Sequence, residues 1–253
     1  MTRTPTITLS AHSLAAVELF ADLPAAARAT LAQAMPAHRY APGEVVFAQD
    51  DSSRDVHFIV SGRARATYYS GLGKEIAFLD LTAGTSFGEL AALDDGPRSA
   101  RVEVLEAAVI ARMAQDAFLA LLAREPLLAR AVMRGLACAV RRLSDRVIEF
   151  STIGVAERLQ AELLRLARAG EVRGNRATVR QFPTHAELAT RISTHREAVT
   201  RELSRLRKAG LCGKVQRRVL VFEDLAGLTA RVESARREGA TISGAAAVAD
   251  RAH

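Results

Sequence analysis

The chain has 253 residues, enough for one large domain or two medium ones, with 49% hydrophobic and 25% charged residues and a net charge of +7. These proportions are typical of a soluble globular protein, and no apolar run approaches the roughly 20 residues that span a bilayer, which excludes a membrane protein. Cys138 and Cys212 match no metal or redox spacing, and the first ten residues show no secretory signal. We therefore expect a reduced, cytoplasmic protein without a metal site.

The excess positive charge is concentrated in one part of the chain. Residues 1–150 carry 16 Lys and Arg against 17 Asp and Glu, whereas residues 151–233 carry 16 against nine. Such a basic block indicates a domain that meets a polyanion, although a basic surface without a partner has the same composition.

The N-terminal half is predicted to be mainly β-structure. After a flexible segment over residues 1–13 and a helical opening that ends near Met35, short segments with period-two alternation recur at intervals of about ten residues, separated by Gly, Asp, Ser or Pro. This spacing predicts an antiparallel β-barrel or jelly roll over residues 14–125. Within it, YSGLGKE (69–75) lacks the spacing of a phosphate-binding loop and predicts a hairpin turn. His57 falls in a strand, where a barrel histidine is expected rather than a haem ligand.

A long helix follows over residues 126–151. Its apolar residues alternate steps of three and four, in a pattern made by Met133, Leu136, Val140, Leu143, Val147 and Phe150. Valine at the a positions and leucine at the d positions favour a two-stranded parallel coiled coil, and therefore a homodimer. The alternative is a helix packed on its own barrel, since an apolar stripe this short also suits a core helix.

The basic block, residues 152–233, predicts a helix over 155–169, a strand, two short helices and a final hairpin. Each short helix is preceded by an S/T-x-x-E signal, Thr184 to Glu187 and Thr194 to Glu197, which predicts two capping boxes ten residues apart. This is the pattern of a winged helix-turn-helix, whose second helix enters the major groove of double-stranded DNA. Residues 234–253 are small and polar, and a flexible tail is predicted there.

The second short helix carries the candidate base-reading side chains. Arginine can donate two hydrogen bonds to guanine and glutamate can accept from cytosine, although Glu197 could instead only close its capping box. Basic residues at the hairpin tip suit contacts with phosphates. The full candidate set is Thr184, Thr194, His195, Arg196, Glu197, Thr200, Arg201, Lys214, Arg217 and Arg218. Ser193 occupies the turn position where glycine is usual.

The segment FGELAALDDGPRSARV (87–102), the long helix and the winged helix-turn-helix occur in an order that closely resembles the Crp/Fnr family of bacterial transcription regulators. The resemblance covers roughly residues 14–225. It implies an α+β fold, with an N-terminal cyclic-nucleotide-binding barrel, a long dimerisation helix and a C-terminal winged helix-turn-helix. It also implies RNA polymerase as a partner and a palindromic GTGA-like DNA site, matched by Arg196, Glu197 and Arg201.

The same resemblance implies a cyclic nucleotide as effector, bound by Gly88, Glu89, Leu90, Arg98 and Ser99. Arg98 suits the cyclic phosphate because its guanidinium binds two oxygens as a fork. Glu89 suits the ribose 2′-hydroxyl and can pair with Arg98. The alternative is an Arg–Glu pair with a structural role only, in a member that has lost its ligand.

Two positions on the long helix match the pair that contacts the purine in the family. Ser144 fits the pattern, whereas Leu143 replaces the hydroxyl residue of the members that respond to cyclic AMP. The resemblance therefore implies cyclic AMP as the first candidate for the effector, with cyclic GMP as its competitor.

The sequence thus predicts a homodimeric DNA-binding regulator gated by a cyclic nucleotide, and not an enzyme. The rivals are a Crp/Fnr-type regulator with no effector or a different one, and a nucleotide-binding subunit that controls a partner enzyme. The helix-turn-helix and the basic block argue against the second rival.

Overall fold

A computed structural model describes residues 6–71 and 75–249 of the protein. The chain falls into two compact units, residues 1–138 and 139–253, which meet within the long helix α5 (Pro126–Thr152). Among the described residues, no helix is long and apolar enough to cross a bilayer. The domain boundaries predicted on either side of this helix, near residues 125 and 151, stay a prediction.

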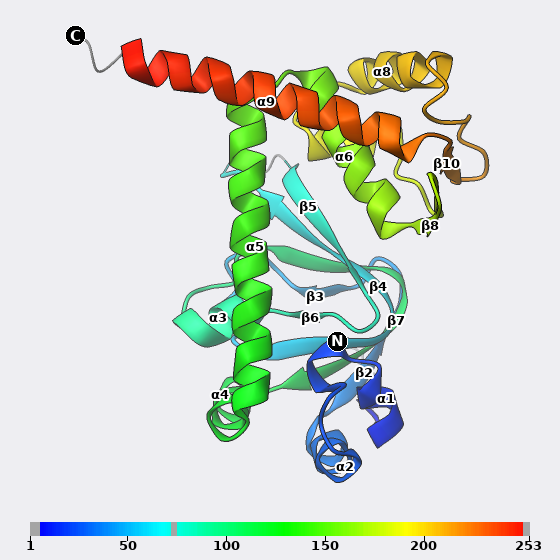
Figure 1. The fold of residues 1–253 in the computed structure, drawn as a ribbon. Helices are drawn as coiled ribbons and strands as arrows, with labels where there is room; N and C mark the ends of the chain where they lie inside the picture. The colour runs from blue at the N-terminus through cyan, green and yellow to red at the C-terminus, as the bar shows by residue number, and fades with distance from the viewer. Residues whose placement is uncertain (1–5, 72–74, 250–253) are drawn as a thin grey trace. The chain divides into compact units, whose positions relative to one another are not determined.

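The N-terminal unit is built on an antiparallel sheet with the order β1-β2-β7-β4-β5, to which β3 and β6 add by pairing with β7 and β4 (Figure 1). Its strands are β1 (Thr6–Ile7), β2 (Ala37–Tyr40), β3 (Val45–Phe47), β4 (Val56–Tyr69), β5 (Glu75–Thr82), β6 (Ser86–Phe87) and β7 (Arg101–Met113). The two longest strands, β4 and β7, pair along most of their length with several register shifts. Gly62 lies at one shift with φ +87°, and a side chain there would overlap the carbonyl of Ala107. The β-rich prediction for this region is confirmed.

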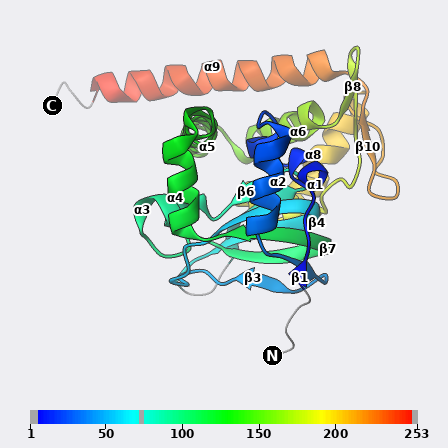
Figure 2. The same ribbon diagram turned by 90° about the horizontal axis from the view of Figure 1, so that it is seen from below.

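Short helices cover the sheet of this unit. They are α1 (Ala11–Ala15), the 3₁₀ turn η1 (Glu18–Phe20), α2 (Ala25–Ala34), α3 (Glu89–Asp94) and α4 (Gln115–Arg124). Helices α1 and α2 pack together (Figure 2). Phe20, Phe58 and Phe118 are fully buried in the core beneath them.

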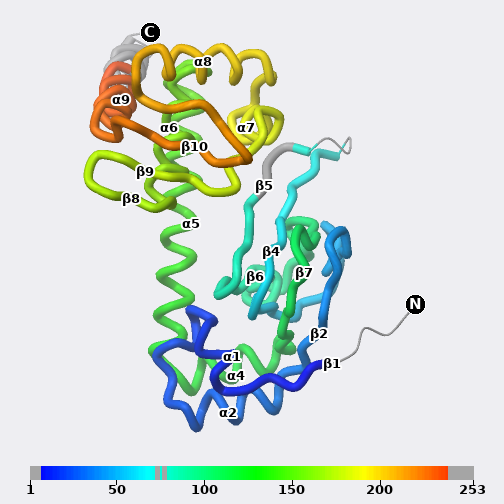
Figure 3. Tube along the Cα trace, turned by 90° about the vertical axis from the view of Figure 1, so that its right-hand side faces the viewer, coloured from blue at the N-terminus to red at the C-terminus, as the bar shows by residue number. Residues whose placement is uncertain are grey.

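The C-terminal unit has a second core. Its elements are α6 (Val155–Ala169), β8 (Glu171–Arg173), β9 (Arg176–Val179), α7 (His185–Arg191), α8 (Arg196–Lys208), β10 (Leu220–Phe222) and α9 (Leu225–Ala249). Leu159, Leu163 and Ala167 recur at helical spacing and turn one face of α6 into this core. The strands form a three-stranded sheet in the order β10-β9-β8, visible in Figure 3. The predicted helix over 155–169 agrees with α6.

The described parts of both predicted flexible segments contain regular secondary structure. In the segment 1–13, Thr6 and Ile7 pair with β2 and α1 begins at Ala11. In the segment 234–253, α9 continues the chain as helix to Ala249. The hairpin turn predicted for YSGLGKE includes residues 72–74, which lie outside the described residues, and the strands on either side of it, β4 and β5, pair antiparallel.

Candidate functional site

The turn between β6 and α3 requires glycine. Gly88 follows β6 and is the N-cap residue of α3, with φ +83°, a left-handed conformation that L side chains rarely adopt. A Cβ at this position would lie 2.5 Å from Nη1 of Arg98. The absence of a side chain therefore lets the arginine lie directly against the backbone.

Arg98 is a buried cation surrounded by neutral acceptors. The exposed fraction of Arg98 is 1%. Nε donates to Oγ of Ser53 at 3.1 Å, Nη1 to the carbonyl of Gly88 at 2.9 Å and Nη2 to the carbonyl of Asp55 at 2.7 Å. The guanidinium also lies 4.1 Å from the ring centre of Phe47. Burial lowers the pKa of Arg98, and the nearby acidic residues offset this only in part. In the described part of the chain, no carboxylate lies within ion-pair distance of this guanidinium.

Glu89 points a buried oxygen into the same region. Its Oε2 has no hydrogen-bond partner among the described residues. Burial raises the pKa of the Glu89 carboxyl, and Arg98 lowers it to a smaller extent. The pairing of Glu89 with Arg98 suggested by the sequence is thus a longer-range attraction and not a direct contact. Leu90 and Ser99, the other candidates of this segment, are exposed.

An aromatic wall that the sequence does not reveal lies beside Arg98. The rings of Phe47 and Phe87 lie 5.4 and 5.2 Å from the imidazole of His57. Burial, then Arg98 and Arg112, lower the pKa of His57 to about 3. His57 is therefore a buried, neutral barrel residue, but its Nδ1 has no partner in the described residues. Phe47 and Ser53 precede Arg98 by some 50 positions, and no local motif marks them.

The apolar stripe of α5 is exposed. Met133, Val140, Leu143 and Val147 have exposed fractions of 59%, 62%, 64% and 66%. Met133 lies in the same unit as the barrel, and packing of α5 on that barrel would bury it, so its exposure favours the coiled-coil interpretation. Leu143 and Ser144, the candidate base contacts, both lie on this helix and are exposed.

The first helix of the predicted helix-turn-helix starts as expected. Oγ1 of Thr184 accepts from the backbone N–H of Glu187 at 3.2 Å, and the Glu187 carboxylate accepts from the N–H of Thr184 at 2.7 Å. This is a complete capping box. The turn that follows contains Ser193 with φ +50°, a left-handed residue at the usual glycine position.

The prediction of a second capping box, from Thr194 to Glu197, is wrong. The N-cap of α8 is His195 and not Thr194, and no side chain caps it. The backbone N–H of Thr194 bonds instead to the carbonyl of Ala189 at 2.9 Å, because the left-handed Ser193 delays the start of the helix by one residue. Glu197 therefore stands one position too early to close a box, and its exposed carboxylate makes no hydrogen bond within the described residues.

Helix α8 presents one continuous polar face, since Arg196, Glu197, Thr200 and Arg201 are all exposed. Thr200 is held from two sides: its Oγ1 donates to the carbonyl of Arg196 at 3.0 Å and lies 2.8 Å from Nδ1 of His185 in α7. Burial and then Arg196 lower the pKa of His185. His185 is not among the residues predicted from the sequence to contact DNA.

The wing is the hairpin over residues 212–222. Its cations Lys214, Arg217 and Arg218 differ in their surroundings. Arg217 and Arg218 form a two-residue turn with φ of 47° and 59°, closed by two hydrogen bonds between Gln216 and Val219. Lys214 and Arg217 are exposed. Arg218 donates to the carbonyl of Phe182 and lies 3.5 Å from the Glu187 carboxylate. It therefore attaches the wing to α7 as well as adding charge.

Comparison with known proteins gives these two units a family. Residues 37–125 match the cyclic nucleotide-binding domain, and residues 157–231 match the Crp-like helix-turn-helix domain. The chain is 32% identical over 177 residues to the cyclic AMP receptor protein of Thermus thermophilus, covering 68% of this chain and 77% of that one. The chain belongs to the Crp/Fnr family.

Solved structures of lower identity share the fold. A CooA mutant from Carboxydothermus hydrogenoformans has a TM-score of 0.66 at 20% identity, over 78% of this chain and 87% of that one. The c-di-GMP-responsive global regulator CLP of Xanthomonas campestris has a TM-score of 0.58 at 18% identity, over 74% and 93%. As a Crp/Fnr regulator, the chain is a DNA-binding transcription regulator and not an enzyme, it binds DNA through its helix-turn-helix, and dimerisation is typical of its family.

Proposed function

We propose that this regulator is gated by a cyclic nucleotide bound in the N-terminal unit, with cyclic AMP as the first candidate and cyclic GMP as its competitor. The observation that carries the proposal is Arg98, a buried guanidinium whose hydrogen bonds within the described residues go to neutral oxygens. Such a charge needs an anion, and a cyclic phosphate supplies one with two oxygens for the guanidinium fork.

Two further features fit the rest of a cyclic nucleotide. The buried Oε2 of Glu89 lacks a donor, and a ribose 2′-hydroxyl would provide one. The missing side chain at Gly88 lets a ligand approach the backbone next to Arg98. Ser99 and Leu90 are exposed beside these groups and complete the proposed contacts.

Base recognition is proposed to come from α5 of the dimer. Ser144 offers one hydroxyl to the purine, whereas Leu143 offers none. We therefore expect weaker discrimination between adenine and guanine than a site with two hydroxyls would give. The relative from Thermus thermophilus is named for cyclic AMP, and CLP is described as responsive to c-di-GMP. A different effector is the second candidate, favoured by Leu143.

For the DNA side, we propose that Arg196, Glu197 and Arg201 read a palindrome of GTGA-like halves. The free carboxylate of Glu197 supports base reading over capping. Lys214 and Arg217 would contact phosphates. The remaining candidates would lie near the sugar-phosphate backbone of the DNA, namely Thr184, Thr194, His195 and Thr200. Two copies joined through residues 126–151 would place two α8 helices on successive half-sites, and RNA polymerase would be the partner at the promoter.

The test is a calorimetric titration of the purified dimer with cyclic AMP and cyclic GMP side by side, followed by DNA binding with each. We expect one of them to bind and to raise affinity for the palindrome. If neither binds, the proposed effector class is wrong.

The DNA contacts are tested by two substitutions. Arg196→Ala should weaken binding to the palindrome by about 1–3 kcal/mol and relax the preference at one base pair, whereas Lys214→Ala should weaken binding to all DNA sequences alike.

A further inference from the structure

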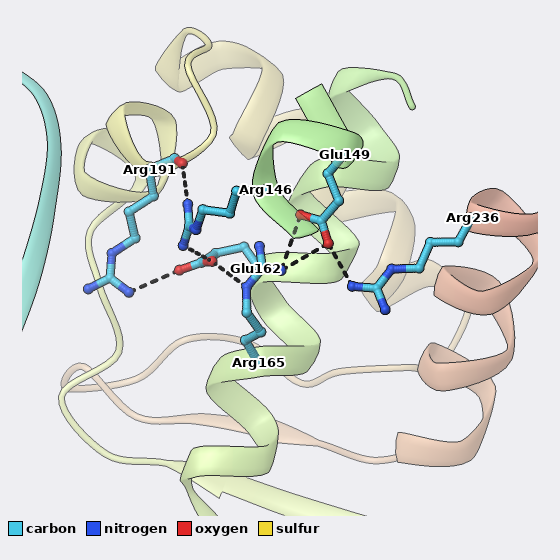
Figure 4. A network of polar contacts seen from close by, with 6 residues as sticks. All are labelled: Arg146, Glu149, Glu162, Arg165, Arg191 and Arg236. Atoms are coloured by element: carbon cyan, nitrogen blue, oxygen red, sulfur yellow. Dashed lines mark hydrogen bonds and ion pairs between the residues drawn. The ribbon is translucent and has the colours of Figure 1, made fainter. Parts of the chain in front are cut away.

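Two buried glutamates and four arginines form a polar cluster inside the C-terminal unit. The exposed fractions of Glu149 and Glu162 are 4% and 2%. Figure 4 shows the cluster, which consists of Arg146, Glu149, Glu162, Arg165, Arg191 and Arg236. Its members come from four helices, α5, α6, α7 and α9.

Glu162 of α6 is the centre of the cluster. Its Oε2 accepts from Arg146 of α5 and from Arg165, both at 3.0 Å, and its Oε1 accepts from Arg191 of α7 at 3.0 Å. Burial raises the pKa of Glu162. The three arginines around it lower the pKa by more than burial raises it, so that the pKa lies below the ordinary value. The carboxylate is thus ionised and fully partnered.

Glu149 of α5 extends the cluster to the last helix. Its two oxygens accept from Nη1 of Arg165 at 3.0 and 3.1 Å, and Oε1 also accepts from Arg236 of α9 at 2.6 Å. Hence α5 is attached to α6 in both directions, by Arg146 to Glu162 and by Glu149 to Arg165. These contacts span the break at Ile153 and Gly154 where the chain passes from α5 to α6.

The cluster also reaches the DNA-reading helices. Arg146 donates to the carbonyl of Arg191, the last residue of α7, at 2.9 Å. On the same helix α6, the amide of Gln160 donates to the buried carboxylate of Glu202 in α8 at 2.7 Å. Helix α6 therefore holds both helices of the helix-turn-helix while it is itself held by α5.

We call this cluster of six residues the joint. Its place on α5 links it to the proposed ligand site. Arg146 lies two residues after Ser144, the proposed base contact. A shift of α5 by a fraction of a turn would separate Arg146 from the Glu162 carboxylate and from the carbonyl of Arg191. Because weakening a buried ionic network is unfavourable, we expect α7 to move with α5. Exposed ion pairs exert no such constraint.

We propose that Glu162, with Arg146 and Arg191, is a positioning residue that transmits the state of the dimer helix to the DNA-reading helices. The nature of the signal rests on the proposed function, but the mechanical joint does not. Two substitutions test it in the full-length dimer. Glu162→Gln removes the central charge, and Arg146→Gln is the milder variant for the case in which the first does not fold, because Glu162 then keeps two arginines.

The matched control is Glu171→Gln, which breaks the exposed ion pair with Arg180 in the same unit. Affinity for the palindrome is measured with and without cyclic AMP. We expect the gain in affinity caused by cyclic AMP to shrink by about fivefold or more in Glu162→Gln and Arg146→Gln and to be unchanged in the control. An unchanged gain in both variants would overturn the proposal.

A second readout separates this inference from the proposed function. Without any ligand, amide hydrogen exchange in Arg146→Gln should accelerate together in residues 146–153 and 185–192, because the two segments share one joint. If wild type ignores cyclic AMP but this joint acceleration occurs, the effector assignment fails and the inference stands. Acceleration confined to α5 would refute the inference, whatever the ligand does.

Discussion

The two units bury charge in opposite ways. In the described part of the N-terminal unit, Arg98 donates to neutral oxygens and one oxygen of Glu89 has no hydrogen-bond partner. In the C-terminal unit, each carboxylate oxygen of Glu149 and Glu162 accepts from at least one arginine. A buried charge with unused bonding capacity points to a ligand, whereas a buried charge with all its bonds made points to a rigid joint.

The largest effect should come from Arg98. Arg98→Leu would leave the ligand's phosphate unpaired in a desolvated pocket, so cyclic nucleotide binding should weaken by several kcal/mol and become unmeasurable by calorimetry. Arg101→Leu is the control, because Arg101 lies in the same segment but pairs with Glu103 at the surface. Equal binding by Arg98→Leu and the control would remove Arg98 from the pocket.

Glutamate-to-glutamine substitutions should separate the two kinds of buried charge. Glu149→Gln should lower the free energy of unfolding by about 3 kcal/mol, since Arg236 loses its counter-charge and Arg165 keeps only that of Glu162. Glu89→Gln should not lower it, since its carboxylate has an unpartnered oxygen, but it should weaken nucleotide binding about tenfold. Denaturant unfolding and calorimetry measure the two quantities. A larger stability loss in Glu89→Gln than in Glu149→Gln would reverse the comparison.

Acid should lower the stability of the N-terminal unit through His57. Because its folded pKa of about 3 lies below the ordinary 6.5, the unfolded chain binds a proton there that the native chain does not. This contribution to stability is complete above pH 6.5 and is lost as the pH falls toward 3, by roughly 2 kcal/mol at pH 5. His57→Phe should show a smaller loss between pH 7 and pH 5 than wild type. The exposed His12→Gln should behave like wild type, and equal losses in all three proteins would exclude His57 as the cause.

The base preference should respond weakly to Leu143. Leu143→Thr adds a hydroxyl beside Ser144 and should raise the preference between cyclic AMP and cyclic GMP by about 1 kcal/mol. Paired titrations of both proteins with both ligands measure it. A thousandfold preference already present in wild type and unchanged in the variant would contradict the argument from Leu143.

Local patterns predicted much of this molecule. Period-two alternation predicted the β-rich unit, and helical periodicity predicted α5 and α6. The box at Thr184 formed as predicted because it involves four adjacent residues. The box at Thr194 did not, because Ser193 takes a left-handed conformation that the pattern does not encode.

Contacts between distant residues could not be predicted in this way. Glu162 meets Arg146 and Arg191 at separations of 16 and 29 residues, and Arg236 meets Glu149 at 87. Arg98 was identified from its motif, but its contacts with Ser53 and Phe47 depend on how the sheet folds back. The helical course of α9 is likewise invisible in a segment rich in small residues.

At the wing tip, we expect Arg217 to lower stability and to strengthen DNA binding. Arg217 holds a left-handed conformation that favours glycine, and its side chain is exposed. Arg217→Gly should therefore stabilise the unit by about 0.5–1 kcal/mol while lowering the salt dependence of DNA binding, as denaturation and salt titration would measure. A more stable protein that binds less DNA would mean that selecting variants for heat resistance alone discards residues that we propose contact DNA.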